Sequence, residues 1–174
     1  MAERLVGVQA PAFEMETALG NGEAFGKVSL EGYKGKWLVM FFYPLDFTFI
    51  CPTEITAFSD AAAQFNELNA EVLAVSTDSV HSHKAWINNG LGQLNIQIAS
   101  DNNHQVSRDY GVLIEDKGIA LRGLFIVDPD GVLQYSVNHN TNIGRNVEET
   151  LRVLQALQSG GLCGINWKPG QPNL

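Results

Sequence analysis

Cysteine and positive charge are both scarce in this sequence of 174 residues. Its two cysteines, Cys51 and Cys163, lie far apart, which excludes the dense disulfide framework of a small secreted domain. Eleven Lys and Arg stand against nineteen Asp and Glu, giving a formal net charge of −8 that opposes sequence-independent binding to nucleic acid or to anionic membranes. We therefore expect no nucleic-acid partner and no membrane partner.

Long apolar runs, a secretion signal and cofactor motifs are also missing. The longest apolar run, residues 37–43, is too short to cross a bilayer, and the first residues contain no apolar stretch behind a basic start. No glycine-rich dinucleotide motif or phosphate-loop motif follows a strand pattern, so no nucleotide, flavin or other cofactor is expected. These observations predict a cytoplasmic protein.

The hydrophobic pattern predicts one α/β domain followed by a short tail. Residues 13–30 indicate a hairpin around Gly-Asn-Gly, and the run 37–43 indicates a strand buried on both faces. Residues 52–70 place an apolar residue every three or four positions, as an amphipathic helix does. Further strands and helices alternate along the chain, at 71–78, 81–89, 96–101, 103–112, 121–137 (a hairpin around Asp-Pro-Asp-Gly) and 146–158. We expect residues 1–158 to form the domain and the Gly- and Pro-rich residues 159–174 a flexible tail that carries Cys163.

Cys51 lies where the predicted strand gives way to the predicted helix that starts near Pro52. Free N–H groups collect at the start of a helix and favour an anion there. A cysteine so placed is stabilised as the thiolate, which is the nucleophilic form. A buried, inert cysteine that ends a strand is an equally good interpretation of the position alone. Glu54 stands three residues later, so Cys51 is not half of a Cys-x-x-Cys pair.

The residues around Cys51 resemble the active-site loop of the peroxiredoxins. Pro44, Thr48 and Cys51 match the family pattern Pro-x-x-x-Thr-x-x-Cys, within the string PLDFTFICPTE. Segments along the rest of the chain resemble the typical two-cysteine subgroup, in order: DYGV, RGLFIVDPDG, GRNVEETLRVLQALQ and CGINWKPG. The resemblance implies a thioredoxin-like α/β fold, with a mixed central sheet flanked by helices and an N-terminal hairpin.

The resemblance also implies an activity and roles for residues near Cys51. It implies a thiol-dependent peroxidase that reduces hydrogen peroxide and organic hydroperoxides, with Cys51 as the peroxidatic cysteine that becomes a sulfenic acid. Arg122 would contact the thiolate and the peroxide, Thr48 would hydrogen-bond to the peroxide, and Pro44 would shield the sulfur from water. A surface arginine on a strand is the alternative for Arg122.

Two further charged residues and the second cysteine complete the implied site. Glu54 would orient Arg122, and Arg145 would join them. The alternatives are an acid favoured in the first turn of a helix and a basic residue at the entry to the next one. Cys163 would be the resolving cysteine, forming a disulfide with Cys51 that in this subgroup joins two subunits. The implied partners are thioredoxin or an alkyl hydroperoxide reductase flavoprotein as reductant, and other copies of the chain in a homodimer and a ring of five dimers.

The sequence departs from the pattern of members that peroxide inactivates easily. Those members carry Gly-Gly-Leu-Gly and a C-terminal helix containing Tyr-Phe. Here residues 89–92 read Asn-Gly-Leu-Gly, and the chain has no Tyr-Phe after Cys163. We therefore expect easy disulfide formation and resistance to overoxidation.

Other functions are weighed against the peroxidase. A metal site built from histidines is disfavoured because His-x-His on a helix does not point both rings to one side, so solvated or capping histidines are expected at His81, His83, His104 and His139. A redox-switched chaperone, or a binding module without activity, would keep the same fold. Peroxide-dependent turnover with a thiol reductant separates the enzyme from both, and light scattering by a client protein tests the chaperone.

The aromatic residues allow two interpretations. These side chains could pack in the core of the domain. Alternatively, the aromatic side chains in the loop before Cys51 could pack between dimers. The residues concerned are Phe41, Phe42, Phe47, Phe49 and Trp86.

Overall fold

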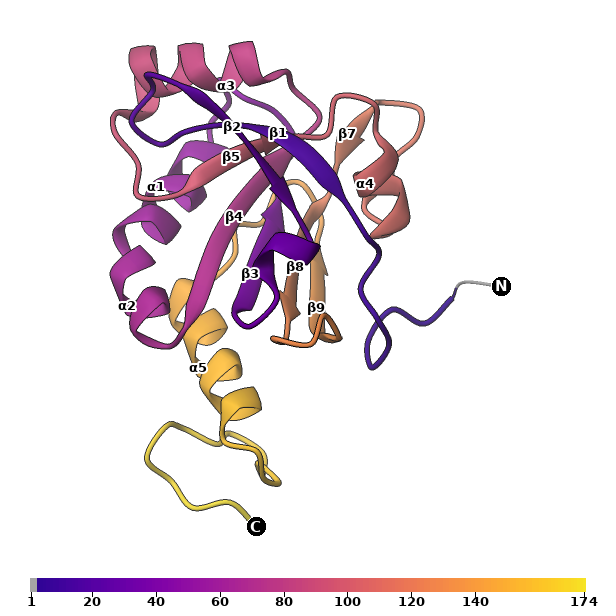
Figure 1. Cartoon of the computed structure of the whole chain (residues 1–174), viewed down its shortest axis with the longest axis vertical. Helices are drawn as coiled ribbons and strands as arrows, with labels where there is room; N and C mark the ends of the chain where they lie inside the picture. Colours follow the sequence, from indigo (N-terminus) through magenta and orange to yellow (C-terminus); the bar gives the residue numbers. More distant parts are fainter. Residues whose placement is uncertain (1–2) are drawn as a thin grey trace.

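The computed structural model describes residues 3–174 and has a seven-stranded mixed sheet at its centre, with strand order β2-β1-β5-β4-β3-β8-β9 (Figure 1). The strands of this sheet are β1 (Glu14–Ala18), β2 (Phe25–Ser29), β3 (Trp37–Phe42), β4 (Ala70–Ser76), β5 (Gln97–Ser100), β8 (Arg122–Val127) and β9 (Leu133–His139). β3, β4 and β5 run parallel, and the remaining pairs are antiparallel. The mixed sheet expected from the sequence is confirmed.

β3 is an interior strand of the sheet, next to the middle strand β4, and its uninterrupted apolar sequence fits that place. It pairs with β4 on one side and β8 on the other. Because side chains alternate across a strand, Leu38, Met40 and Phe42 face one hydrophobic core while Val39 and Phe41 face the other. All five are completely buried. The sheet therefore needs cover on both faces.

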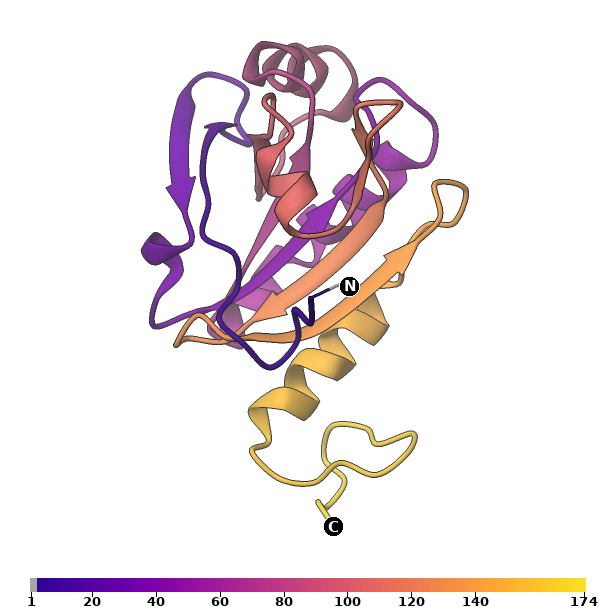
Figure 2. The same cartoon turned by 90° about the vertical axis from the view of Figure 1, so that its right-hand side faces the viewer.

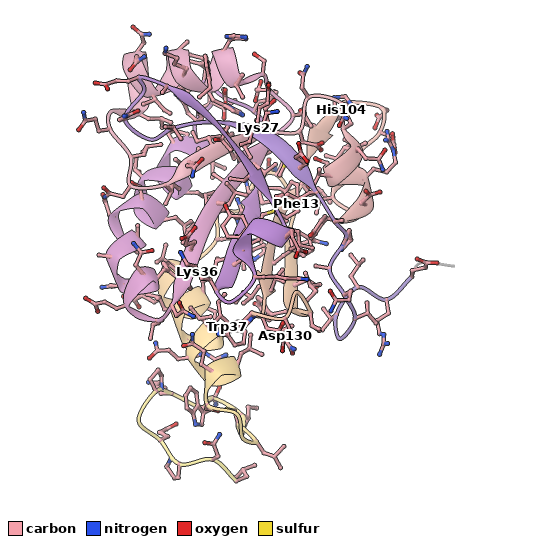
Figure 3. The ribbon with its side chains drawn as sticks, in the orientation of Figure 1. Phe13, Lys27, Lys36, Trp37, His104 and Asp130 are labelled. Atoms are coloured by element: carbon pink, nitrogen blue, oxygen red, sulfur yellow. The ribbon has the colours of Figure 1, made fainter. Side chains whose placement is uncertain are left out.

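The helices supply that cover, and they are α1 (Cys51–Asp60), α2 (Ala62–Glu67), α3 (Val80–Trp86), α4 (Gln105–Asp109) and α5 (Val147–Gln158). Side chains of α1, α2, α3 and α5 contribute to the core that contains Phe41, whereas Val106 of α4 belongs to the core that contains Phe42. In that second core the Phe13 ring, labelled in Figure 3, lies 6.5 Å from the rings of Tyr33 and Tyr110. The helix expected at 52–70 is divided at Ala61, whose ψ of −1° departs from helical geometry.

The two predicted hairpins are confirmed. β1 and β2 pair from Glu14–Ser29 to Ala18–Phe25 around the Gly-Asn-Gly loop. Between β8 and β9 the carboxylate of Asp128 accepts hydrogen bonds from the backbone N–H groups of Asp130 and Val132, and Gly131 adopts φ +85°. Asp and Gly fit such a turn because a short side chain can bond to the backbone and glycine tolerates positive φ.

α5 extends beyond the lower edge of the sheet, and residues 159–174 follow it as a loop that folds back on itself (Figure 2). These sixteen residues contain turns but neither helix nor strand, as expected. Arg152 of α5 donates to the carbonyl of Trp167 at 2.9 Å, and the N–H of Leu174 donates to the carbonyl of Leu162. The flexibility of this tail stays a prediction.

Several short elements were not predicted from the sequence. A small hairpin joins β6 (Leu113–Ile114) to β7 (Ile119–Ala120), a 3-10 turn spans Glu31–Tyr33, and a π-turn spans Ile87–Leu91. Two to five residues are too few to display a hydrophobic period. Among the helices of the described chain, none combines the length and the apolar character needed to cross a bilayer.

Candidate active site

Cys51 is the first residue of α1 and lies at the carboxyl edge of the parallel strands. Residues 43–50 lead to it directly from the end of β3, and Pro52 occupies the first turn of the helix. Ile50, which precedes the helix, offers no side-chain cap to the first N–H groups. The sulfur is therefore at the positive end of the helix dipole, and the residue is only 1% exposed.

Arg122 brings a positive charge to this sulfur. It is the first residue of β8, which runs antiparallel to β3 and so begins at the edge where β3 ends. Nη1 lies 3.4 Å from the Cys51 sulfur and donates to Oε1 of Glu54 at 2.6 Å, while Nε donates to the carbonyl of Thr141 at 2.8 Å. The side chain is buried, so the interpretation as a surface arginine is wrong.

Glu54 and Arg145 complete a buried ionic cluster. Glu54, one turn after Cys51, accepts from Nε of Arg145 at 2.6 Å, from its Nη2 at 2.8 Å and from its backbone N–H at 2.8 Å. Arg145 also donates to the carbonyl of Gly123, and its guanidinium lies 5.1 Å from the centre of the Phe41 ring. Glu54 thus fixes both arginines. Glu54 does lie in the first turn of α1 and Arg145 at the entry to α5, as the alternatives describe, but both side chains are in addition bound into this cluster.

The cluster carries one more positive than negative charge when the sulfur is neutral. Burial favours the neutral form of Glu54, but hydrogen bonds and charge from Arg145, with the charge of Arg122, outweigh it and lower the pKa of Glu54. Burial lowers the pKa of Arg145, although a guanidinium stays charged in the working range. Two guanidinium groups against one carboxylate leave a charge that a thiolate at Cys51 would neutralise.

Pro44 and Thr48 lie in the loop that precedes Cys51. Pro44 is buried directly after Tyr43, and Thr48 is half-buried. The hydroxyl of Thr48 donates to the carbonyl of Leu45 at 2.8 Å, which leaves its oxygen able to accept another hydrogen bond. Their roles toward a peroxide stay predictions.

Cys163 is far from Cys51 within the same chain, and both cysteines are free. Its sulfur lies 3.6 Å from the carbonyl of Ala156, near the C-terminal end of α5, while Arg145 adjoins the N-terminal end of that helix. The twelve residues of α5 span about 18 Å at 1.5 Å per residue. A disulfide needs Cα atoms within about 7 Å, so these two cysteines cannot pair within the chain as it is folded here.

A second cluster of buried polar groups was not predicted from the sequence. His83 is completely buried on α3, where Nδ1 lies 2.8 Å from Oδ2 of Asp46 and Nε2 lies 3.1 Å from the carbonyl of Ala99. The expectation of a solvated or capping histidine is therefore wrong for His83, because the ring satisfies its hydrogen bonds inside the protein. Its partner Asp46 stands 37 positions earlier, which no local pattern reveals. Within residues 3–174 no group of three or more His, Cys, Asp or Glu side chains is arranged to hold a metal ion.

The aromatic residues divide between the two interpretations. Phe41 and Phe42 are completely buried and Trp86 nearly so, which places all three in the core. Phe47 and Phe49 are 58% and 92% exposed. The loop before Cys51 therefore presents two phenylalanines at the surface, and their packing between dimers stays a prediction.

Comparison with known proteins agrees with this geometry. The AhpC/TSA family profile matches residues 6–136. The chain is 64% identical to "Putative peroxiredoxin YkuU" of Bacillus subtilis, with all of both chains covered. It is 55% identical to "Thioredoxin-dependent peroxide reductase, mitochondrial" of Mus musculus, covering 95% of this chain and 67% of that protein.

Two solved structures are also similar to this chain over nearly all of its length. The reduced 2-Cys peroxiredoxin of Plasmodium vivax superposes with a TM-score of 0.95 at 37% identity, covering 98% of this chain and 93% of that one. AhpC of Mycobacterium tuberculosis superposes with a TM-score of 0.85 at 40% identity, covering 96% of this chain and all of the other.

Proposed function

The chain belongs to the AhpC/TSA family, and from that premise we propose that it reduces hydrogen peroxide and organic hydroperoxides at Cys51 in a cycle completed by Cys163. It is a thiol-dependent peroxidase of the peroxiredoxin type with a thioredoxin-like fold. The observation that carries the assignment to Cys51 is its buried contact with Arg122, in a cluster with one surplus positive charge.

In the first step the Cys51 thiolate attacks the terminal oxygen of the hydroperoxide. A sulfur–oxygen bond forms, the O–O bond breaks, and the departing alkoxide or hydroxide takes up a proton to leave as alcohol or water. Arg122 stabilises the thiolate and then the charge that develops on the peroxide oxygens. Thr48 and Pro44 hold the peroxide in line and keep water from the sulfur. Cys51 is left as a sulfenic acid.

In the second step the Cys163 thiolate of another subunit attacks the sulfenic sulfur. A disulfide forms, and the hydroxyl group leaves as water after taking up a proton. The length of α5, about 18 Å, supports resolution between subunits rather than within one. Because Cys51 is only 1% exposed, the first turn of α1 has to unwind before another sulfur can reach it.

The cycle closes when an external dithiol reduces the disulfide. We propose thioredoxin or an alkyl hydroperoxide reductase flavoprotein as that reductant; the name of the mouse relative supports the first. A homodimer follows from resolution between subunits, and the exposed Phe47 and Phe49 support further packing of five dimers into a ring. A reducing compartment such as the cytoplasm suits two free thiols.

Electrophoresis of the oxidised protein tests this cycle. The reduced protein, freed of reductant, receives one equivalent of hydrogen peroxide per subunit and is run on a denaturing gel without reductant, beside Cys51→Ser and Cys163→Ser. We expect a dimer band in the wild type that both variants lack. Loss of thiols without a dimer band would contradict resolution between subunits, and thiols that survive for minutes would contradict the peroxidase assignment itself.

A further inference from the structure

The loop that carries Pro44 and Thr48 has an anchor of its own, separate from the arginine cluster. The carboxylate of Asp46, in the middle of this loop, accepts from the hydroxyl of Tyr43 at 2.6 Å and from that of Ser82 at 2.8 Å. Nδ1 of His83 lies 2.8 Å from the same carboxylate. Burial and the charge of Asp46 raise the pKa of Tyr43, so the phenol keeps the proton that it donates. Three side chains thus converge on one buried acid.

The contact between Asp46 and His83 is a buried hydrogen bond, with Nδ1 of the ring 2.8 Å from Oδ2 of the carboxylate. The carbonyl of Ala99 can only accept, so Nε2 of His83, 3.1 Å away, carries a hydrogen. Nδ1 faces the carboxylate of Asp46, whose other two partners, the hydroxyls of Tyr43 and Ser82, donate to it. The two side chains are 0% and 1% exposed. Such a contact fixes geometry strongly, since removing either side chain leaves the other buried without its hydrogen-bond partner.

The backbone of the loop is tied to the same edge of the sheet. The N–H of Asp46 donates to Oδ2 of Asp78 at 2.9 Å, and Ser76 donates to the same oxygen. The next residue, Phe47, adopts φ +57° with its ring 5.7 Å from that of Trp86 on α3. A residue with a bulky side chain rarely adopts a positive φ, and this backbone conformation persists only where the surrounding contacts impose it. Asp46 and Trp86 hold the loop on both sides of this turn.

We propose that Asp46 is a positioning residue of the peroxidase site: held by Ser82 and His83 of α3, it sets the place of Thr48 relative to the Cys51 sulfur. This inference rests on the peroxidase function proposed above. The arginine cluster is built from α1, β8 and Arg145 in the loop before α5, none of which supplies a contact to the Asp46 carboxylate. One support therefore governs the charge of the sulfur, and the other governs the loop that receives the peroxide.

Two reactions of the same sulfur separate these supports. Stopped-flow tryptophan fluorescence gives the rate of Cys51 oxidation by hydrogen peroxide, and alkylation by iodoacetamide reports the reactivity of the thiolate without needing an aligned peroxide. In Asp46→Ala we expect the peroxide rate to fall by about 10- to 100-fold, because a small misplacement of a reacting geometry has that effect. The alkylation rate should stay the same or rise. Asp46→Asn, which keeps the shape and one acceptor, should lose less.

The control is Asp116→Ala, which removes an exposed acid in the turn between β6 and β7 and should leave both rates unchanged. Circular dichroism confirms that each variant folds; if Asp46→Ala does not, Ser82→Ala removes one donor alone and should shift the ratio of the two rates in the same direction. An unchanged ratio of peroxide to alkylation rate in the folded variants would overturn the inference. A wild type that peroxide does not oxidise would instead overturn the proposed function.

Discussion

Replacing Arg122 with glutamine should slow the reaction of Cys51 with peroxide without unfolding the protein. The variant removes the guanidinium whose Nη1 lies 3.4 Å from the sulfur. Glu54 keeps its three hydrogen bonds to Arg145, so no buried carboxylate is left unpaired. The surplus positive charge of the cluster disappears, and the thiolate loses its counterion.

The size of the effect follows from that contact. Two unit charges about 4 Å apart attract by about 4 kcal/mol at an effective dielectric constant near 20, which is an upper bound for a delocalised guanidinium. A hydrogen bond to a charged group contributes about 1.5–3 kcal/mol net. A loss of about 1.5–3 kcal/mol corresponds to a reaction of Cys51 with peroxide that is about 10- to 100-fold slower at fixed pH.

Stopped-flow fluorescence at several peroxide concentrations measures this rate. Arg122→Lys should fall between the wild type and Arg122→Gln, since an ammonium keeps the charge but cannot reach Cys51, Glu54 and the Thr141 carbonyl at once. Arg108→Gln is the control, because Arg108 pairs with Glu115 at the surface. Equal peroxide rates in the wild type and Arg122→Gln would refute the reasoning.

Four further outcomes are expected. The pKa of Glu54 is lower in the folded protein than in the unfolded chain, where it is near 4.3, so the charge of Glu54 stabilises the fold above about pH 4.3 and this contribution is lost as the pH falls through the folded pKa. The difference in free energy of unfolding between wild type and Glu54→Gln, measured in urea, should therefore shrink below about pH 4.3. A difference that stays constant with pH would contradict this. Phe58→Ala removes a fully buried ring whose centre lies 4.5 Å from that of Phe41, and it should lower the free energy of unfolding in urea by about 3–5 kcal/mol. A loss below about 1 kcal/mol would count against the packing described. Phe49→Ser, which alters a side chain 92% exposed, should leave the melting temperature unchanged but reduce assemblies above the dimer in sedimentation velocity; unchanged assemblies would exclude this contact from the interface. Mass spectrometry during turnover at rising peroxide should find little sulfinic acid at Cys51, and early inactivation would argue against the expected resistance to overoxidation.

The elements that the sequence predicted well are those whose pattern is local. The apolar run 37–43 reads as a buried strand because every side chain in it needs cover, and the structure buries both of its faces. The amphipathic helix expected at 146–158 is α5, and Asn146 caps its start with a side chain that accepts from the N–H of Glu149. The order of the strands follows from long-range packing, which no local period records.

The candidate site likewise contains features that neighbouring residues predict and contacts that they do not. The place of Cys51 at the start of a helix could be derived from neighbouring residues, but its contact with Arg122 joins positions 71 apart and was expected only through the family resemblance. The buried hydrogen bond between Asp46 and His83 was missed because His83 lies among polar residues that resemble an exposed helix face. Burial of a histidine depends on a partner that the neighbouring sequence does not reveal.

The buried charges of the arginine cluster are balanced only while Cys51 is a thiolate. While Cys51 is a thiolate, two guanidinium groups and one carboxylate balance it, and the buried site is neutral. In the proposed cycle Cys51 becomes a sulfenic acid, which carries no charge while it keeps its proton, so oxidation would leave the interior with one cation that has no counterion. Water can stabilise that cation only if the site opens. In the cycle proposed above, oxidation of Cys51 would therefore remove part of the electrostatic attraction that holds the first turn of α1 in place, and the sulfenic acid intermediate would favour the opening that attack by Cys163 requires.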